Sequence, residues 1–132
     1  MRPLPTVLAA LLGALLVAGP RPAAAAQPSL NAYFQSTLKD PAYQKKTFER
    51  VARRWKAPPA AGFPKPRSKT VVQAVLTKEG KLASTTVSTS SGSKRWDEAA
   101  LAAVMTAAPF DPLPAGYGYP TLEVHFHVSL EP

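Results

Sequence analysis

The chain has 132 residues, 15 prolines, no cysteine and a formal net charge of +8 at neutral pH. This length suits one small domain, and the lack of cysteine excludes disulfides and a lipid-modified cysteine. A basic surface favours an anionic partner such as acidic protein, anionic lipid or nucleic acid.

The first 26 residues have the layout of a secretory signal peptide. Arg2 gives a weak positive start, the apolar run covers Leu4–Gly19, Pro20–Pro22 breaks it, and Ala24–Ala26 supplies an A-x-A site. We therefore predict cleavage before Gln27 and an exported protein, which makes nucleic acid the least favoured of the three anionic partners.

The alternative is an uncleaved helix that anchors the protein in the inner membrane. The apolar run is shorter than the roughly 20 residues that span a bilayer. This length favours cleavage, and a membrane contact is expected only if the segment is retained.

Residues 27–40 form a lead that the sequence pattern does not assign, and residues 41–132 are predicted to be the domain. Asp40 and Pro41 are a helix start, with Asp40 as the cap and Pro41 at the first helical position. A helix is expected over residues 42–56.

This helix has an apolar stripe that should face the core. The stripe consists of Gln44, Phe48, Val51, Ala52 and Trp55. Phe48 and Trp55 are the expected core anchors.

Basic residues cover the rest of the same helix. They are Lys45, Lys46, Arg50, Arg53, Arg54 and Lys56. We interpret them as a solvated face, and the alternative is a surface that docks on an anionic lipid or polymer.

After a proline-rich loop over Ala57–Ser68, the sequence predicts a β-hairpin. Thr70–Thr77 is rich in β-branched residues, Lys78–Lys81 is a turn with a flexible glycine at Gly80, and Leu82–Thr89 continues as a second strand.

The two strands of this hairpin differ in their side-chain pattern. In the first strand, Val72, Ala74 and Leu76 should face the core. In the second, Leu82 and Val87 share a face only if a bulge interrupts the strand between them.

A second helix is expected over Trp96–Ala107, with Ser93 as its cap. Pro109 ends it, and Phe110 and Leu113 lie between prolines that fix their backbone. These two apolar side chains are expected to close the end of the core.

Thr121–Leu130 alternates cleanly between apolar and polar residues, as a strand with one buried face does. His125 and His127 share its polar face and form the only histidine pair. A zinc site needs three or four ligands, so the pair is interpreted as part of a solvated strand face. No nucleophile, carboxylate pair or phosphate loop is found, and we predict neither enzymatic activity nor a metal or other cofactor.

Taken together, these segments resemble the C-terminal domain of the TonB/TolA family of periplasmic energy transducers. The matching parts are Phe48–Pro58, the hairpin turn at Glu79-Gly80, Ser90–Gly92, Trp96–Leu101, Pro109-Phe110, Pro112–Pro114 and the alternating last strand. The Trp-x-x-Pro ending of the first helix and the Pro-Leu-Pro segment are most similar to the TolA-like branch.

The resemblance implies an α+β fold, a two-layer α-β-β-α-β domain whose three-stranded antiparallel sheet packs against two helices. The first strand would be central and the last strand would lie at one edge. The family's activity is protein binding, often by pairing an edge strand with a partner peptide.

On this reading the last strand carries the partner-binding residues. They are Thr121, Leu122, Glu123, Val124, His125, Phe126, His127 and Val128. The expected partner is an outer-membrane receptor or a Tol-like periplasmic protein, and self-pairing of the same edge would instead give a homodimer.

Family transducers also carry an inner-membrane helix and a long periplasmic linker, and this sequence shows no such linker. The prediction is therefore a stand-alone exported binding domain in the periplasm, as part of envelope transport or a Tol-like system. The alternative is a membrane-anchored component of an energy transducer.

Overall fold

The computed structural model describes residues 26–35 and 37–132. Its elements are β1 (Gln27–Phe34), α2 (Pro41–Arg54), the short 3-10 helix η1 (Ala60–Gly62), β2 (Lys69–Thr77), β3 (Leu82–Thr89), α3 (Lys94–Ala107) and β4 (Thr121–Glu131). The predicted signal peptide lies outside the described residues except for Ala26.

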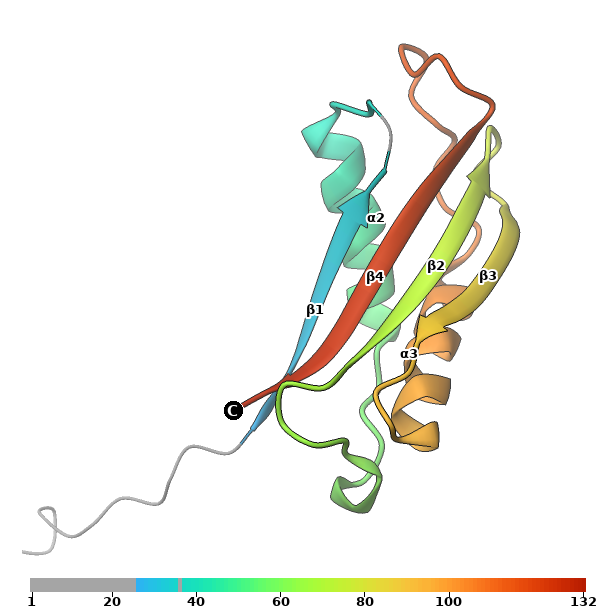
Figure 1. Ribbon diagram of the computed structural model, residues 1–132. Helices are drawn as coiled ribbons and strands as arrows, with labels where there is room; N and C mark the ends of the chain where they lie inside the picture. Colours follow the sequence, from blue (N-terminus) through green and yellow to red (C-terminus); the bar gives the residue numbers. More distant parts are fainter. Residues whose placement is uncertain (1–25, 36) are drawn as a thin grey trace, which may run out of the picture.

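The strands form one antiparallel sheet in the order β1-β4-β2-β3, and both helices cover the same face of it (Figure 1). The two-layer α+β class is confirmed. The expectation of three strands is wrong, because the unassigned lead forms β1 and adds a fourth strand. The expectation that the last strand lies at an edge is also wrong, since β4 lies between β1 and β2.

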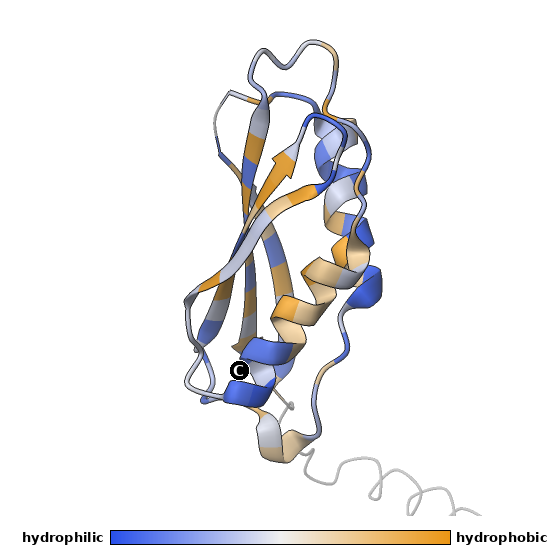
Figure 2. Cartoon of the chain, turned by 90° about the vertical axis from the view of Figure 1, so that its right-hand side faces the viewer, coloured by the Kyte–Doolittle hydropathy of each residue, from blue (hydrophilic) through white to orange (hydrophobic). Residues whose placement is uncertain are grey.

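Alternate residues of β2 and β4 point into the layer between the sheet and the helices. Seen edge-on, the strands carry alternating hydrophobic and hydrophilic bands (Figure 2). The predicted inward residues Val72, Ala74 and Leu76 are completely buried. Phe110 and Leu113, predicted to close the core, are also buried.

Helix α2 begins as predicted, because the Asp40 carboxylate accepts a hydrogen bond from the Tyr43 backbone N–H at 3.0 Å. The buried side chains are Tyr43, Thr47 and Val51, so the predicted stripe is displaced around the helix. Phe48 is partly exposed, and Trp55 is only half-buried.

Two polar residues can lie on the buried stripe because their hydroxyl groups form hydrogen bonds inside the fold. The Tyr43 hydroxyl donates to the Asp111 carbonyl at 3.1 Å. The Thr47 hydroxyl donates to the Tyr43 carbonyl at 2.9 Å. A tyrosine and a threonine with satisfied hydroxyls can therefore occupy core positions.

Helix α3 is capped by Ser93, whose hydroxyl accepts from the Trp96 N–H at 3.2 Å. Trp96 is completely buried, and its indole N–H donates to the Val128 carbonyl at 3.0 Å. Trp55 and Phe63 pack edge-on against the same indole. Trp96 thus ties α3 to β4.

The hairpin between β2 and β3 contains the predicted bulge. The register shifts at Ala83, between the pairs Val75–Ser84 and Leu76–Leu82, and a second shift occurs at Ser88. Leu82 and Val87 consequently both pair with inward-facing residues of β2.

Candidate partner-binding site

The predicted binding strand has two unlike faces. The side chains of Leu122, Val124, Phe126 and Val128 are at most 1% exposed and belong to the core. Only the backbone of these four residues can take part in recognition. Glu123, His125 and His127 alternate with these four residues along β4 and therefore lie on the open face of the sheet.

We predicted from the sequence that the edge of β4 is free for a partner strand, but β1 occupies this edge. The two strands pair antiparallel without a register shift, from Gln27 opposite Glu131 to Phe34 opposite Val124. One further bond continues this ladder, from the Gln35 N–H to the Glu123 carbonyl at 3.0 Å. The β4 edge thus accepts an added strand, and the strand comes from the same chain.

Sequence reasoning missed β1 because its pattern is weak. Pro28 lacks a backbone N–H donor, which is unfavourable in a strand, and Asn31 is a polar residue among apolar ones. The available signal was the alternation of Leu30, Ala32 and Phe34, which pack against the core while remaining partly exposed.

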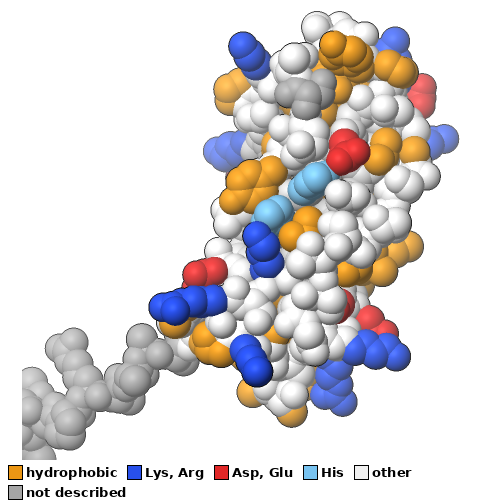
Figure 3. All heavy atoms as spheres, in the orientation of Figure 1, with side chains coloured by type: hydrophobic (Ala, Val, Ile, Leu, Met, Phe, Trp, Pro, Cys, Tyr) orange, Lys and Arg blue, Asp and Glu red, His pale blue; other side chains and the backbone are white. Residues whose placement is uncertain are grey.

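On the open face, the two histidines have different neighbours. The Nε2 atom of His125 lies 2.5 Å from a carboxylate oxygen of Glu123. The ring of His127 is tilted against Tyr33 of β1, with 4.5 Å between ring centroids. Figure 3 shows both histidines in the middle of this face, with an acidic side chain on one side and a basic one on the other.

Burial lowers the pKa of His127, and the positive charge of Lys69 and the neighbouring His125 lower it further. At neutral pH the ring is therefore uncharged. It offers an aromatic surface and one N–H donor to a neighbour on the open face. Tyr33 uses that surface and is itself 50% exposed.

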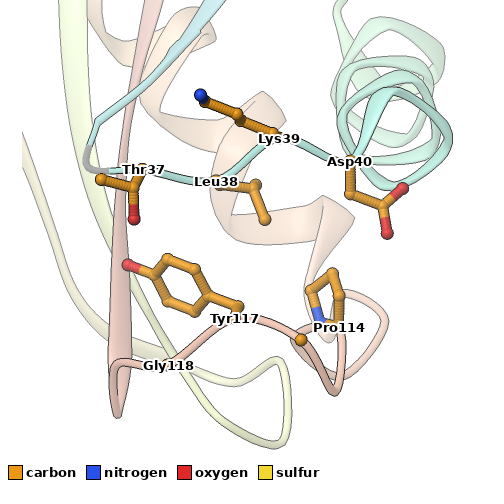
Figure 4. A pocket seen from close by; sticks show the side chains of 8 residues that line it. Thr37, Leu38, Lys39, Asp40, Pro114, Tyr117 and Gly118 are labelled. Carbon is orange, nitrogen blue, oxygen red and sulfur yellow. The ribbon is translucent and has the colours of Figure 1, made fainter.

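A cavity of about 260 Å³ lies beside the loop that leads into β4. The connection from β1 to α2, residues 37–40, forms one wall, and the loop carrying Pro114, Tyr117 and Gly118 forms the other (Figure 4). The Tyr117 hydroxyl is already used, because it donates to the Thr121 carbonyl at 2.9 Å. The cavity thus separates the β1–α2 connection from the loop that leads into β4.

The basic face of α2 is partly engaged in the fold. Arg50 donates to the Pro109 carbonyl at 2.6 Å and 3.2 Å, and the Lys46 ammonium lies 3.9 Å from an Asp111 carboxylate oxygen. The side chains of Arg53 and Arg54 are exposed. This face is therefore a partly solvated basic surface on the side of the molecule away from the histidines.

A polar cluster surrounds Asp97 at the start of α3, and it was not predicted from the sequence. Its carboxylate accepts from Thr70 Oγ1 at 2.5 Å, from the Ser91 N–H and hydroxyl at 2.9 Å and 2.8 Å, and from the Ser90 hydroxyl. Burial alone would raise the pKa of Asp97, but these hydrogen bonds outweigh it and hold the pKa below its usual value. The cluster fastens the end of β3 to α3 and to β2.

Within residues 26–35 and 37–132, no helix is long and apolar enough to cross a membrane. In the same part of the chain, no three or more His, Asp or Glu side chains are grouped so that they could hold a metal ion.

Neither the curated proteins nor the solved structures contain a match to this chain. The sequence model of one family, described as TonB C terminal, matches residues 40–128. That segment begins at the cap of α2 and includes both helices, β2, β3 and most of β4. The match covers more than half of the sequence, so the chain belongs to the TonB C-terminal family.

Proposed function

We propose that this protein is an exported domain of the cell envelope that recognises an extended segment of a partner protein by strand pairing along β4. Domains of the TonB C-terminal family are protein-interaction modules of the envelope. One observation supports the mode of binding. The β4 edge already pairs with an antiparallel strand over eight consecutive residue positions, without a bulge.

The proposed contact has two parts. Backbone N–H and C=O groups of β4 supply affinity that does not depend on sequence, and side chains on the open face supply selectivity. His125 and His127 are the selective side chains, because the alternate residues of the strand are buried. The proposed partner is an outer-membrane receptor or a Tol-like periplasmic protein, and the domain resembles the TolA-like branch most.

The test measures how much partner protein the full chain captures from native envelope extract, and it compares two double variants with the unchanged chain. In the first, His125→Glu and His127→Glu place two carboxylates on the open face of β4. In the control, Ser84→Glu and Thr86→Glu place two on the exposed strand β3, two strands away. Circular dichroism checks that both variants are folded.

We expect the histidine variant to bind the partner with about tenfold lower affinity, a loss of about 1.4 kcal/mol of binding free energy. The β3 control should bind as the unchanged chain does. Equal capture by all three proteins would exclude the open face of β4 as the contact surface.

A second candidate function is suggested by the exposed arginines of α2. This face would dock on anionic lipid of the envelope through charge alone. Binding to vesicles that contain anionic lipid should then vanish as salt shortens the screening length to about 8–10 Å. Binding that persists at this ionic strength would contradict it.

The alternative of a membrane-anchored transducer component rests on residues that the structure does not describe. The mass of the protein purified from its native host separates the two forms. A chain that starts at Gln27 has lost the anchor, and β1 is then its first element.

A further inference from the structure

Strand β1 lies outside the segment that matches the family model. The family match begins at residue 40, after β1 has ended at Phe34. The matched segment by itself contains three strands and both helices, with β4 at an edge of its sheet. In this chain β1 therefore lies where the sheet of the matched segment would otherwise present a free edge.

The side chains of β1 are less buried than those of β4, the strand with which it pairs. None of its eight residues is buried, whereas the inward side chains of β4 are at most 3% exposed. Three side chains, Leu30, Ala32 and Phe34, pack against the core while remaining partly exposed. The Tyr33 ring also lies against His127. Along its length β1 pairs with the β4 backbone, a contact that other extended peptides can form as well.

Contacts within the fold hold the chain in place at Leu38 and Asp40, shortly after β1 ends. Leu38 is buried in the core, the Leu38 carbonyl accepts from the Gln44 side chain at 3.4 Å, and Asp40 caps α2. The cavity beside residues 37–40 leaves space next to this connection. The two hydrogen bonds that hold the start of α2 therefore do not involve β1.

We infer that β1 is a displaceable strand that occupies the partner's position, and that the partner segment carries the side-chain pattern of β1. This inference rests on the proposed function and names the regulation and ligand chemistry of the same edge. The partner segment is an extended peptide that runs antiparallel to β4. Apolar residues at alternate positions replace Leu30, Ala32 and Phe34, and an aromatic residue replaces Tyr33 beside His127.

A reversible lock tests the displacement in the full chain. Ser29 and Ser129 are paired across β1 and β4, and such pairs have Cα atoms about 4.5–5.5 Å apart, within the range that a disulfide spans. The protein has no cysteine of its own. In the variant Ser29→Cys/Ser129→Cys, oxidation fixes β1 in place and reduction releases it, so each sample is its own control.

The probe is a fluorescent peptide with the sequence of residues 27–35. A control peptide carries Leu30→Asp and Ala32→Asp, which remove its apolar contacts with the core. A third protein carries these two substitutions in its own β1, so that the strand is released more often.

The oxidised variant should not bind the probe, and reduction should restore the binding of the unchanged chain. The protein with the weakened β1 should bind about tenfold more tightly, because apparent affinity scales with the fraction of molecules whose edge is free. The control peptide should bind none of the proteins. Equal probe binding by the oxidised and reduced forms, or binding by no form, would overturn the inference.

The same lock distinguishes this inference from the proposed function. If the oxidised chain captures the envelope partner as well as the reduced chain, and capture still depends on His125 and His127, the displacement is wrong and the binding face is right. If capture never depends on the histidines, the proposed function itself fails. If the lock abolishes capture that depends on the histidines, both are supported.

Discussion

The two edge strands of the sheet, β1 and β3, differ in how open they are to another strand. Strand β1 pairs with β4 in one unbroken register. Strand β3 pairs with β2 through two register shifts, at Ala83 and Ser88. Bulges twist an edge and discourage strand addition. The β3 edge is thus protected, and the β1 side of the sheet is the regular one.

The two strands also differ in how they are held. Strand β3 follows a tight turn at Gly80, whose carbonyl accepts from the Phe110 N–H at 2.9 Å, and its end is fixed by the Asp97 cluster. Strand β1 has three partly buried apolar side chains and a backbone ladder. This difference favours β1, and not β3, as the strand that a partner segment would replace.

The largest expected effect comes from truncating a core side chain of β4, the strand that pairs with β1. Phe126→Ala should lower the free energy of unfolding by about 3–5 kcal/mol, because Phe126 is completely buried and leaves a cavity. Phe34→Ala in β1 should cost only about 1–1.5 kcal/mol, since Phe34 is already partly exposed. Urea unfolding followed by circular dichroism measures both, and equal losses would show that β1 is held as firmly as β4.

A smaller effect is expected at the turn that holds β3. Gly80 has φ +89°, and an added Cβ would lie 2.1 Å from the Phe110 carbonyl oxygen. Gly80→Ala should therefore lower the free energy of unfolding by about 1–3 kcal/mol. The control is Gly118→Ala, because a Cβ at Gly118 meets no atom within 4 Å.

Both glycine variants are compared by thermal unfolding. A control as destabilised as Gly80→Ala would mean that the general loss of glycine, and not the turn geometry, accounts for the effect. A Gly80→Ala protein as stable as the unchanged chain would mean that the turn does not constrain β3.

Features that depend on local chemistry were predictable from the sequence. Asp40 and Ser93 were identified as caps, and both accept the expected backbone hydrogen bond. The bulge in β3 followed from the five-residue spacing of Leu82 and Val87. In each case a few adjacent residues contain the whole physical reason.

Features that depend on distant partners were not predictable. Strand β1 is stabilised by the backbone of β4, about 100 residues later in the chain, so its own side chains carry little signal. Tyr43 lies in the core because the Asp111 carbonyl accepts its hydroxyl, which no helical period reveals. The family match begins at residue 40, so β1 lies outside the segment by which the family is recognised.

The same limit applies to the candidate site. The sequence placed His125 and His127 on one face of a strand, and the structure puts both on the open face. Their neighbours come from elsewhere in the chain, namely Tyr33 of β1 and Lys69 of β2. The occupied edge of β4 could be recognised only once the pairing of β1 was known.

The smallest expected effect concerns the cluster that fastens β3 to α3. Asp97→Asn removes the negative charge that Ser90, Ser91 and Thr70 donate to, and should cost about 1–1.5 kcal/mol of stability at neutral pH. Glu98→Gln is the matched control, because Glu98 is the exposed neighbour on the same helix. Urea midpoints at neutral pH separate the two variants.

The pH dependence sharpens this last prediction. The folded-state pKa of Asp97 lies below the ordinary aspartate value of 3.8, so the unfolded chain binds the proton first as the pH falls. The stabilisation by Asp97 is therefore complete above about pH 5 and is lost as the pH falls through 3.8 toward the folded pKa. The unchanged protein should lose more stability over this window than Asp97→Asn, and the stability difference between the two should shrink. A difference that stays constant down to acid pH would show that Asp97 contributes through shape and not through its charge.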